Sequence, residues 1–370
     1  MKLFGNKRSS RAVSRSAGST TRRGNTVEVS VNPPGERRRR KKRRGGRTLL
    51  TLFILAAVVV SGYAFLKNYI APPPIVEQDI PTPNVNDNQP SSINGRKTGV
   101  YTMIVAGTDL GDYHTDTLMV VYIDTNKKEV NALSIPRDTL VDVTRSTKKI
   151  NSAYGIGGGK NIEQLKTEMA GVLGFKPDFY AVCKLKAFEE LIDAVGGVYI
   201  DVPRDMKYSD PYQNLVIDIK KGAQVLDGKN AIGYMRYRKG YAEGDLGRID
   251  AQHVFLSELA KKLTTPAIIT KLPQLAKIFV ENVNTDLSLG NLIWLANEMK
   301  SIDPSTVKFY RLPGVPDTYN KLSYYFVDEE NTKLLINDKF NPFDEPIEVL
   351  GISSIKPPTA RFPNIDWSEV

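Results

Sequence analysis

Three charged residues, Asp109, Asp116 and Arg137, stand where predicted β-strands end, and residues that contact ligands are often found at such positions. Two carboxylates brought together repel each other, and a hard divalent cation offsets that repulsion. An arginine beside them can hold a phosphate oxygen that the cation also contacts. This pattern predicts a site for Mg²⁺ or Mn²⁺ and a phosphate group. The alternative is that both aspartates form turns and that Arg137 makes a local ion pair.

The grouping of these residues depends on a hairpin that the apolar pattern predicts. The segments 117–123 (TLMVVYI) and 129–135 (EVNALSI) are strand-like and flank a polar turn. In such a hairpin the numbers of two paired residues add up to about 253, so Arg137 lies opposite Asp116, and Asp138 follows it. The hairpin therefore brings the charged residues to one edge of a sheet.

A second cluster of charged residues comprises Arg236, Arg238, Asp245 and Arg248. Arg236 and Arg238 project to the same side if their segment is extended. Arg248 is expected to open a helix that begins near Ala251, where free N–H groups and the helix dipole favour an anion. Arginines that converge on a helix N-terminus indicate a clamp for a diphosphate. Judged on spacing alone, an exposed basic loop is the alternative.

Other motifs exclude several kinds of site. The segment 155–160 (GIGGGK) is neither a P-loop nor a GxGxxG motif, because its glycines are misplaced for both. The single cysteine, Cys183, excludes an intramolecular disulfide framework. The chain has only two histidines, His114 and His253, so a Cys/His zinc site is disfavoured. Cys183 is expected in the core and His253 on the surface.

An uncharged run of 19 residues, 48–66 (TLLTLFILAAVVVSGYAFL), predicts one membrane-spanning helix. The run is too long for the apolar part of a signal peptide, and no clear cleavage motif follows it, so it is expected to stay uncleaved. The basic cluster at 37–44 (RRRRKKRR) directly precedes it, and positive charge keeps that side in the cytoplasm. Everything after Lys67 is therefore expected on the outer face of the cell membrane.

The net charge of +10 is concentrated in the N-terminal tail. Residues 1–47 hold 16 Lys and Arg and two acids, whereas the remainder holds 35 basic and 39 acidic residues. This division disfavours a globally basic domain that binds nucleic acid. Because the basic cluster at 37–44 lies beside the membrane segment, we expect it to contact anionic lipid headgroups rather than nucleic acid.

The chain divides into five segments of different composition. We expect a disordered basic tail at 1–47, a transmembrane helix at 48–66, a proline-rich extracytoplasmic stalk at 67–97, a globular domain at 98–340 and a C-terminal extension at 341–370. The stretch from about 340 to 370 is rich in proline and is expected to lie along the surface or to be mobile.

Strand-like and helix-like segments alternate through the globular domain. Strands are expected at 100–107, 117–123, 129–135, 178–185, 198–202 and 307–312, and helices at 161–173, 187–195, 251–263, 267–283, 289–302 and 328–337. This alternation, together with one hairpin, predicts an α/β fold in which helices flank a central mixed β-sheet in three layers.

Several of these segments together resemble the LytR-CpsA-Psr family of cell-envelope proteins. The matching pieces, in chain order, are IVAGTD, TDTLMV, SIPRDT, KINSAYGIGGG, FEELIDAVGGVYIDVP, GAQVLDGKNAIGYMRYR and GDLGR. The combination of SIPRDT, KINSAY and DAVGGV carries the resemblance, because no single piece is specific. It covers about 98–262 strongly and extends more weakly to about 340. A single N-terminal span before an outer domain is also the layout of this family.

The resemblance implies a phosphotransferase that moves an anionic glycopolymer, teichoic-acid-like or capsular, from a polyprenyl-diphosphate carrier to peptidoglycan. A phosphodiester forms, and hydrolysis of the polyprenyl diphosphate is an implied side activity. The implied fold has an apolar groove for the lipid. The alternative is a non-catalytic, membrane-tethered binding or regulatory protein that recognises lipid-linked envelope polymers. The expected partners are the donor, peptidoglycan and the membrane, with no nucleic acid.

The resemblance also implies roles for residues at matching positions. The metal-linked aspartates are Asp109 and Asp116. Catalysis is expected of Arg137, Asp138, Arg236, Arg238, Asp245 and Arg248, among which the arginines hold the diphosphate. Substrate binding is expected of Lys149, Asn151, Tyr154 and Gln252. The chain departs from the family pattern at His114 and Ala251, where arginine is usual.

Overall fold

A computed structural model describes residues 69–75, 95–108, 114–213, 215–242 and 244–363. All of them fall within the unit Val60–Val370. The predicted tail, the predicted transmembrane segment and most of the predicted stalk lie outside the described residues. Within the described ranges, no helix is both long enough and apolar enough to cross a membrane.

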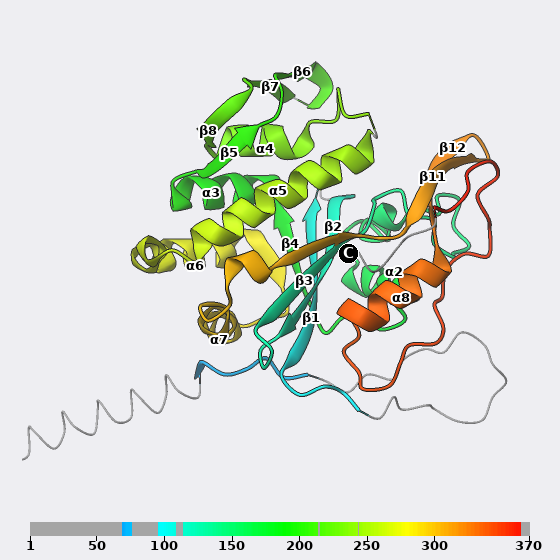
Figure 1. Ribbon diagram of the computed structural model, residues 1–370, viewed down its shortest axis with the longest axis horizontal. Coiled ribbons are helices and arrows are strands. Elements are labelled where there is room, and N and C mark those ends of the chain that lie inside the picture. Colours follow the sequence, from blue (N-terminus) through cyan, green and yellow to red (C-terminus); the bar gives the residue numbers. More distant parts are fainter. Residues whose placement is uncertain (1–68, 76–94, 109–113, 214, 243, 364–370) are drawn as a thin grey trace, which may run out of the picture. The chain divides into compact units, whose positions relative to one another are not determined.

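A six-stranded mixed sheet stands at the centre of the fold, with its strands in the order β10-β3-β2-β1-β4-β9 (Figure 1). The strands are β1 (Val100–Thr108), β2 (Thr115–Asp124), β3 (Glu129–Ser134), β4 (Phe179–Lys184), β9 (Val283–Thr285) and β10 (Lys308–Arg311). β1 is antiparallel to β2 and parallel to β4, and β10 is parallel to β3. The predicted mixed sheet is therefore confirmed.

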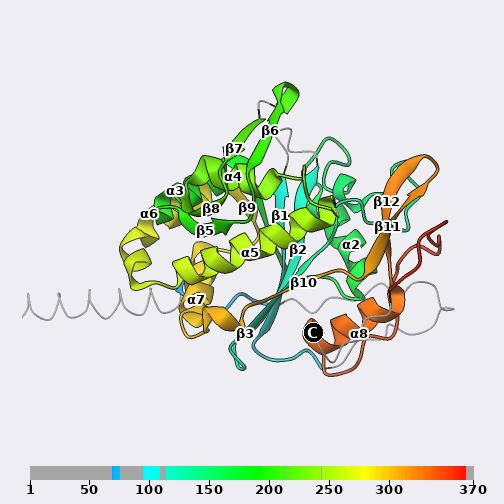
Figure 2. The same ribbon diagram turned by 45° about the horizontal axis from the view of Figure 1, so that its top comes forward.

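Helices cover both faces of this sheet because alternate residues of its apolar strands point to opposite sides. On one face, Ile104 and Leu118 pack with Met169 and Leu335. These two helical residues come from α2 (Ile162–Leu173) and α8 (Glu329–Lys339). The other face carries α3 (Leu185–Val195), α4 (Gly228–Arg236), α5 (Asp245–Leu263), α6 (Leu272–Asn282) and α7 (Leu289–Met299) (Figures 1 and 2). The three-layer prediction is thus confirmed for the described residues.

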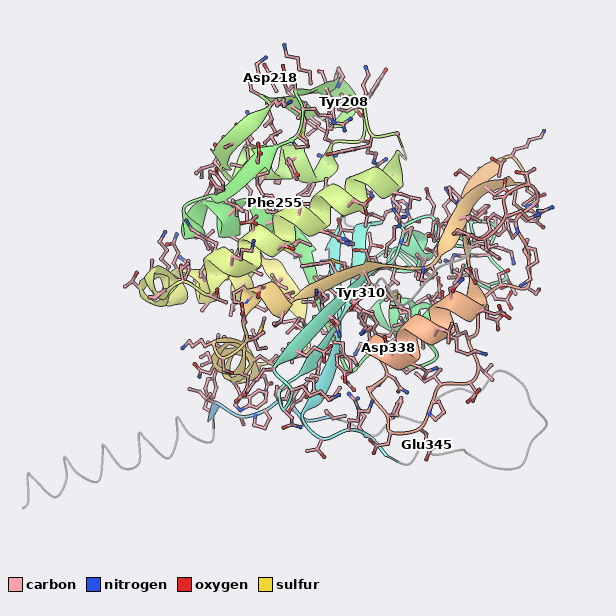
Figure 3. All side chains as sticks on the ribbon, viewed as in Figure 1. Tyr208, Asp218, Phe255, Tyr310, Asp338 and Glu345 are labelled. Carbon is pink, nitrogen blue, oxygen red and sulfur yellow. The ribbon has the colours of Figure 1, made fainter. Side chains whose placement is uncertain are left out.

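Two short two-stranded sheets add a second core on the side of α3, α4 and α5. They pair β5 (Val198–Val202) with β8 (Gly222–Leu226) and β6 (Met206–Asp210) with β7 (Leu215–Ile219). A third pair, β11 (Gly314–Tyr319) with β12 (Leu322–Val327), packs with Leu140 in a separate cluster. Phe255 of α5 is fully buried in this second core, with its ring centroid 5.9 Å from those of Phe188 and Tyr234 (Figure 3). Of these strands, only 198–202 was predicted, because apolar alternation over five residues is a weak signal.

Two helix assignments near the predicted site differ from the sequence analysis. α5 begins at Asp245, earlier than the predicted start near Ala251, and follows Gly244, whose φ of 57° turns the chain there. The segment that ends at Arg236 is helical rather than extended. The side chain of Asp227 caps this helix, α4, by accepting a hydrogen bond from the Asn230 N–H at 2.8 Å. Arg236 and Arg238 therefore do not share an extended segment, and the condition for their projection to the same side is not met.

The segment after α8 contributes to the core instead of lying only along the surface. Ile347 and Leu350 are buried in the cluster that contains α2. The Gly351 N–H donates to the Gly171 carbonyl at 2.7 Å. A Cβ atom added at Gly171 would lie 2.9 Å from the Gly351 carbonyl oxygen, so only glycine allows this close approach.

His253 also differs from its expected position on the surface. Its ring is half-buried on α5, with Nε2 2.8 Å from Ser134 Oγ and the ring 5.3 Å from that of Phe309. Burial lowers the pKa of His253 to about 4, and the charge of Arg311 adds to this shift. The imidazole is therefore neutral near pH 7 and belongs to the contact between α5 and the sheet.

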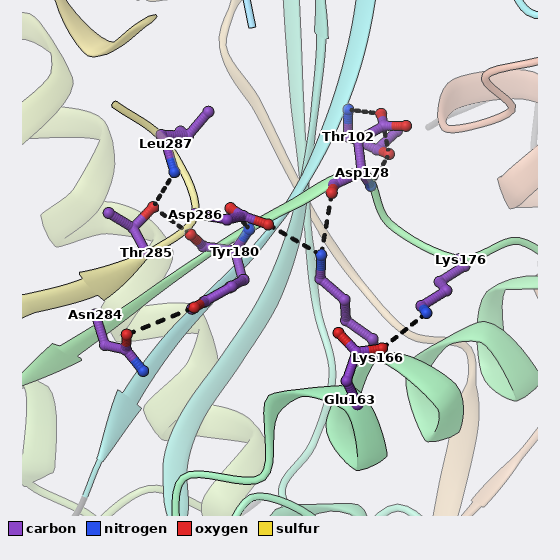
Figure 4. A network of polar contacts seen from close by, with 10 residues as sticks. All are labelled: Thr102, Glu163, Lys166, Lys176, Asp178, Tyr180, Asn284, Thr285, Asp286 and Leu287. Carbon is purple, nitrogen blue, oxygen red and sulfur yellow. Dashed lines mark hydrogen bonds and ion pairs between the residues drawn. The ribbon is translucent and has the colours of Figure 1, made fainter. Parts of the chain in front are cut away.

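A polar network fixes the strands next to β4 (Figure 4). The Asp178 carboxylate accepts hydrogen bonds from the Thr102 N–H at 2.8 Å and from its hydroxyl at 2.7 Å. Lys166 Nζ of α2 donates to the Asp178 carbonyl at 3.0 Å and to the Asp286 carboxylate at 3.1 Å. Asp286 in turn accepts from the Tyr180 N–H at 2.9 Å. These bonds hold β9 and the end of the sheet in place.

Candidate active site

The charged residues of the hairpin meet at the edge where β1, β3 and β4 end and β2 begins. Asp109 follows β1 directly but lies outside the described residues. Met119 pairs with Ser134 across β2 and β3, which is the predicted register. Arg137 Nη1 accordingly donates to Asp116 Oδ1 at 3.0 Å, with the two side chains 25% and 27% exposed. The predicted juxtaposition of Asp116 and Arg137 is confirmed.

Asp245 gathers the arginines of the second cluster at the start of α5. Its Oδ1 lies 3.0 Å from Arg248 Nη2 and 3.2 Å from Arg238 Nε. Arg248 Nη2 also donates to the Asp116 carbonyl at 3.3 Å, which joins this cluster to the hairpin. The Arg248 side chain is only 3% exposed, so its charge depends on these partners. The two clusters predicted from the sequence form one site.

This site has more positive than negative charge. Arg137, Arg238 and Arg248 surround the carboxylates of Asp116 and Asp245. The pKa of Arg248 is lowered to about 10, chiefly by burial; Asp245 opposes the shift, and the other two arginines add to it. The Nε atoms of Arg137 and Arg248 are buried and find no hydrogen-bond acceptor among the described residues. Unsatisfied donors beside excess positive charge indicate an anion with several oxygens, such as a diphosphate.

Three other predicted residues support this site through contacts with the protein. Lys149 Nζ lies 2.9 Å from Asp138 Oδ1. The Asn151 N–H donates to the Arg137 carbonyl at 3.2 Å, and so holds the segment that carries this arginine. Gln252 Nε2 donates at 2.9 Å to a carbonyl of α4, which fixes α5 against α4.

Two predicted residues take other positions. Arg236 is the last residue of α4 and borders an apolar cavity next to Arg248. Tyr154 is 2% exposed, and its Oη accepts a hydrogen bond from Asn284 Nδ2 of β9 at 3.4 Å. The structure thus places Tyr154 on a second cleft rather than among the arginines.

The apolar cavity beside the arginines has an empty volume of about 730 Å³. Its walls include Val105, Gly107, Met119 and Cys183 from the sheet, and Phe188, Ile232, Met235 and Leu256 from the helices. Asp116, Arg236, Arg248 and Gln252 border it on the polar side. Burial raises the pKa of the Cys183 thiol to about 11, so this group is neutral and part of the apolar wall. An anion site joined to such a cavity suits a ligand with an anionic head and a hydrocarbon chain.

Apart from Arg236, the α4 residues that line this cavity were not predicted from the sequence. One face of α4 lines the cavity through Ile232, Met235 and Arg236, which have the i, i+3, i+4 spacing of a helix face. The aromatic residues of this region, Tyr234 and Tyr237, are buried in the second core. That spacing would have indicated the wall only if the segment had been predicted as a helix.

Asp116 is the described carboxylate that lies beside both the hairpin arginine and the cavity. Among the residues the structure describes, no group of three or more His, Cys, Asp and Glu side chains could hold a metal ion. Mg²⁺ is usually bound through one or two carboxylates together with substrate phosphates and water. A carboxylate beside guanidinium groups that suit a phosphate therefore has the chemistry that Mg²⁺ or Mn²⁺ requires.

Comparison with known proteins relates this geometry to one family. The profile of the LytR_cpsA_psr family matches residues 77–340. The regulatory protein MsrR of Staphylococcus aureus (strain COL) is 35% identical over 198 residues, which cover 52% of this chain and 58% of MsrR. The polyisoprenyl-teichoic acid–peptidoglycan teichoic acid transferase TagV of Bacillus subtilis (strain 168) is 37% identical over 180 residues. That match covers 47% of this chain and 45% of TagV, so the chain spans about half the length of these relatives.

The crystal structure of B. subtilis TagV extends this similarity to the fold. It superposes with a TM-score of 0.57 at 28% sequence identity, and the match covers 67% of this chain and 98% of that one. The mixed sheet with flanking helices is thus the fold that this chain shares with TagV.

The contacts of Asp245 yield a first prediction. Replacement of Asp245 by Asn should destabilise the fold by roughly 3–5 kcal/mol, because the buried Arg248 loses its carboxylate. The matched control on the same helix is Asp250→Asn, whose 59% exposed carboxylate lies 3.5 Å from Arg311 and should contribute only about 0–1 kcal/mol. Denaturant unfolding of both variants measures the difference. Equal losses would mean that Asp245 does not stabilise a buried charge.

Proposed function

The chain belongs to the LytR_cpsA_psr family, and from this membership we propose that it is a phosphotransferase that moves a glycopolymer from a polyprenyl-diphosphate carrier to peptidoglycan. The name of TagV, a relative that transfers teichoic acid to peptidoglycan, supports this acceptor and an anionic polymer of the teichoic-acid or capsular kind. Hydrolysis of the polyprenyl diphosphate is the proposed side activity, with water in place of the acceptor hydroxyl.

One observation carries this proposal. Buried, unsatisfied N–H groups of Arg137 and Arg248 lie in the same site as the apolar cavity. A polyprenyl diphosphate has the matching chemistry, since its diphosphate accepts hydrogen bonds and its hydrocarbon chain is apolar. Neither a free nucleotide nor a soluble sugar would occupy both the arginine donors and the apolar cavity.

The arginines supply the binding and the charge stabilisation in the proposed reaction. Arg137, Arg238 and Arg248 would hold the diphosphate and spread the negative charge that develops on its oxygens during transfer. Asp116 and Asp245 fix these guanidinium groups before the substrate arrives. Such preorganisation matters because the site then has little rearrangement to make at the transition state.

The proposed transfer forms one P–O bond and breaks another. A sugar hydroxyl of peptidoglycan attacks the phosphorus that bears the glycopolymer, and polyprenyl phosphate leaves. The hydroxyl proton passes to a carboxylate, for which Asp138 and Asp245 are the candidates. We assign this role to Asp138, because two guanidinium groups hold Asp245, whereas Asp138 is paired with the single amine of Lys149.

We further propose that Asp116, with Asp109, holds Mg²⁺ or Mn²⁺. The ion would act as a Lewis acid on the diphosphate oxygens. Excess chelator should therefore abolish turnover by the wild-type protein, and added Mg²⁺ should restore it. Asp116→Asn should raise the Mg²⁺ concentration needed for half-maximal turnover, because a neutral amide is a weaker ligand. Full turnover in excess chelator would contradict the proposed metal.

The catalytic domain is proposed to act on the outer face of the cell membrane, anchored by the segment 48–66. The uncharged 19-residue run and the preceding basic cluster support this topology. A reporter enzyme that works only outside the cytoplasm should be active when fused after Val370. A matched fusion before the basic cluster at 37–44 should be inactive, and the reverse pattern would refute the orientation.

A second candidate function is that of a regulatory protein that binds lipid-linked envelope polymers without catalysis. The relative MsrR, which carries the name of a regulatory protein, favours this candidate. The two functions differ in one observable. Incubation of the purified full-length chain with a polyprenyl-diphosphate glycan and Mg²⁺ should release polyprenyl phosphate from a transferase, whereas a binding protein would leave the donor intact.

Arg137 gives the sharpest prediction of the transferase proposal. In Arg137→Lys the charge remains but the planar fork of donors is lost, so turnover should fall by roughly 10²–10³. Stability should change by only about 0–1 kcal/mol, since the ion pair with Asp116 is partly exposed. Turnover of a polyprenyl-diphosphate glycan and a melting curve, measured on both proteins, separate the two effects. Near-normal turnover with a lowered melting temperature would make Arg137 a structural residue.

A further inference from the structure

A second cleft opens at the same edge of the sheet, with an empty volume of about 660 Å³. It shares Thr108 and Lys184, the last residues of β1 and β4, with the apolar cavity. Val182 lines this cleft, whereas the next residue, Cys183, lines the apolar cavity. Because successive residues of a strand face opposite sides of the sheet, the two recesses flank the strand ends from opposite faces.

The walls of this second cleft are polar. Its polar lining comprises Tyr154, Asn282 and Asn284 together with Lys160, Lys184 and Glu281. Asn284 joins two tyrosines. Its carbonyl accepts a hydrogen bond from Tyr180 Oη at 3.5 Å (Figure 4). Its amide donates to Tyr154 Oη at 3.4 Å. The Asp286 network holds β9 beside β4, so this wall is built on a fixed part of the sheet.

The segment 155–160, which matches no nucleotide-binding motif, places Lys160 on this cleft. Gly157, Gly158 and Gly159 all have positive φ angles, and Lys160 follows with φ 64°. This conformation is unfavourable for a residue with a side chain. Lys160 also stands just before α2, where the helix dipole disfavours a cation. It is exposed and has no acidic partner among the described residues. A side chain held in this unfavourable backbone conformation, with no ion pair to a described residue, points to a role in binding.

We propose that this cleft binds the acceptor, an N-acetylated sugar strand that carries carboxylates on its peptide stems; the proposal rests on the transferase function. In an in-line displacement the attacking and leaving oxygens lie on opposite sides of the phosphorus. The leaving polyprenyl phosphate belongs to the apolar cavity on one face of the sheet. The acceptor hydroxyl therefore arrives from the other face, where this cleft lies. Asn282 and Asn284 offer the donors and acceptors that hydroxyl and acetamido groups need, and Lys160 suits a carboxylate.

The decisive variant is Lys160→Gly in the full-length chain. It should raise the KM for a soluble peptidoglycan fragment about tenfold, the loss expected for one charge-assisted contact. Release of polyprenyl phosphate from the donor without acceptor should stay at the wild-type rate. The melting temperature should change little, because relief of the left-handed strain offsets the greater freedom of glycine in the unfolded chain.

The chain offers a closely matched control in Lys321→Gly. Lys321 also has φ 64°, but it lies in the turn between β11 and β12. This variant should leave the KM for the acceptor unchanged. As a second probe of the cleft, Asn284→Ala should also raise this KM.

The outcomes separate the two proposals. If the wild-type chain releases no polyprenyl phosphate, the transferase function fails, and this inference fails with it. If the wild-type chain transfers the glycan but Lys160→Gly and Asn284→Ala keep the wild-type acceptor KM, the acceptor cleft alone is refuted. If both variants instead weaken binding of the donor, the cleft holds the glycopolymer of the donor, and the acceptor assignment is wrong.

Discussion

The burial of one guanidinium group, that of Arg248, is the constraint on which the site depends. A cation that is 3% exposed must be compensated, and here Asp245 and the Asp116 carbonyl do so from two different elements. The hydrogen bond to the Asp116 carbonyl also fixes the start of α5 against the first residues of β2. Burial, chiefly, lowers the pKa of Arg248 to about 10, yet the group stays charged near neutral pH. An oxyanion bound there would meet a charge that water screens weakly.

The sheet separates the chemistry of this edge into two compartments. On one side, Gly107 and Cys183 face an apolar cavity whose helical walls come from α3, α4 and α5. On the other side, Tyr154 and Asn284 line a polar cleft. A β-sheet is a single layer of backbone, so a phosphate bound at the end of a strand is accessible to ligands from both faces of the sheet. This arrangement suits a reaction that joins a lipid-linked donor to a hydrophilic acceptor.

The parts of the site that could be predicted are those with short-range causes. The register of β2 and β3 follows from one turn, and it placed Arg137 against Asp116 correctly. The start of α5 could not be predicted from apolar spacing, because its first turn carries the charged residues Asp245 and Arg248, whose partners Arg238 and Asp116 lie outside the helix. The helix α4 was not predicted either, because its apolar residues divide between the second core, where Ala231 and Tyr234 are buried, and the cavity lined by Ile232 and Met235.

The sequence by itself determined the fold class, the hairpin and the pairing of Arg137 with Asp116, because alternation of apolar residues and turn geometry are local properties. Only the tertiary structure decided that the two charged clusters are one site, since residues 116 and 248 are far apart in the chain and meet through a hydrogen bond from the buried Arg248 guanidinium to the Asp116 carbonyl. It also decided that Tyr154 faces a different cleft from the arginines. The side of a sheet that a loop residue reaches depends on which helices pack there, and packing is a property of the whole fold.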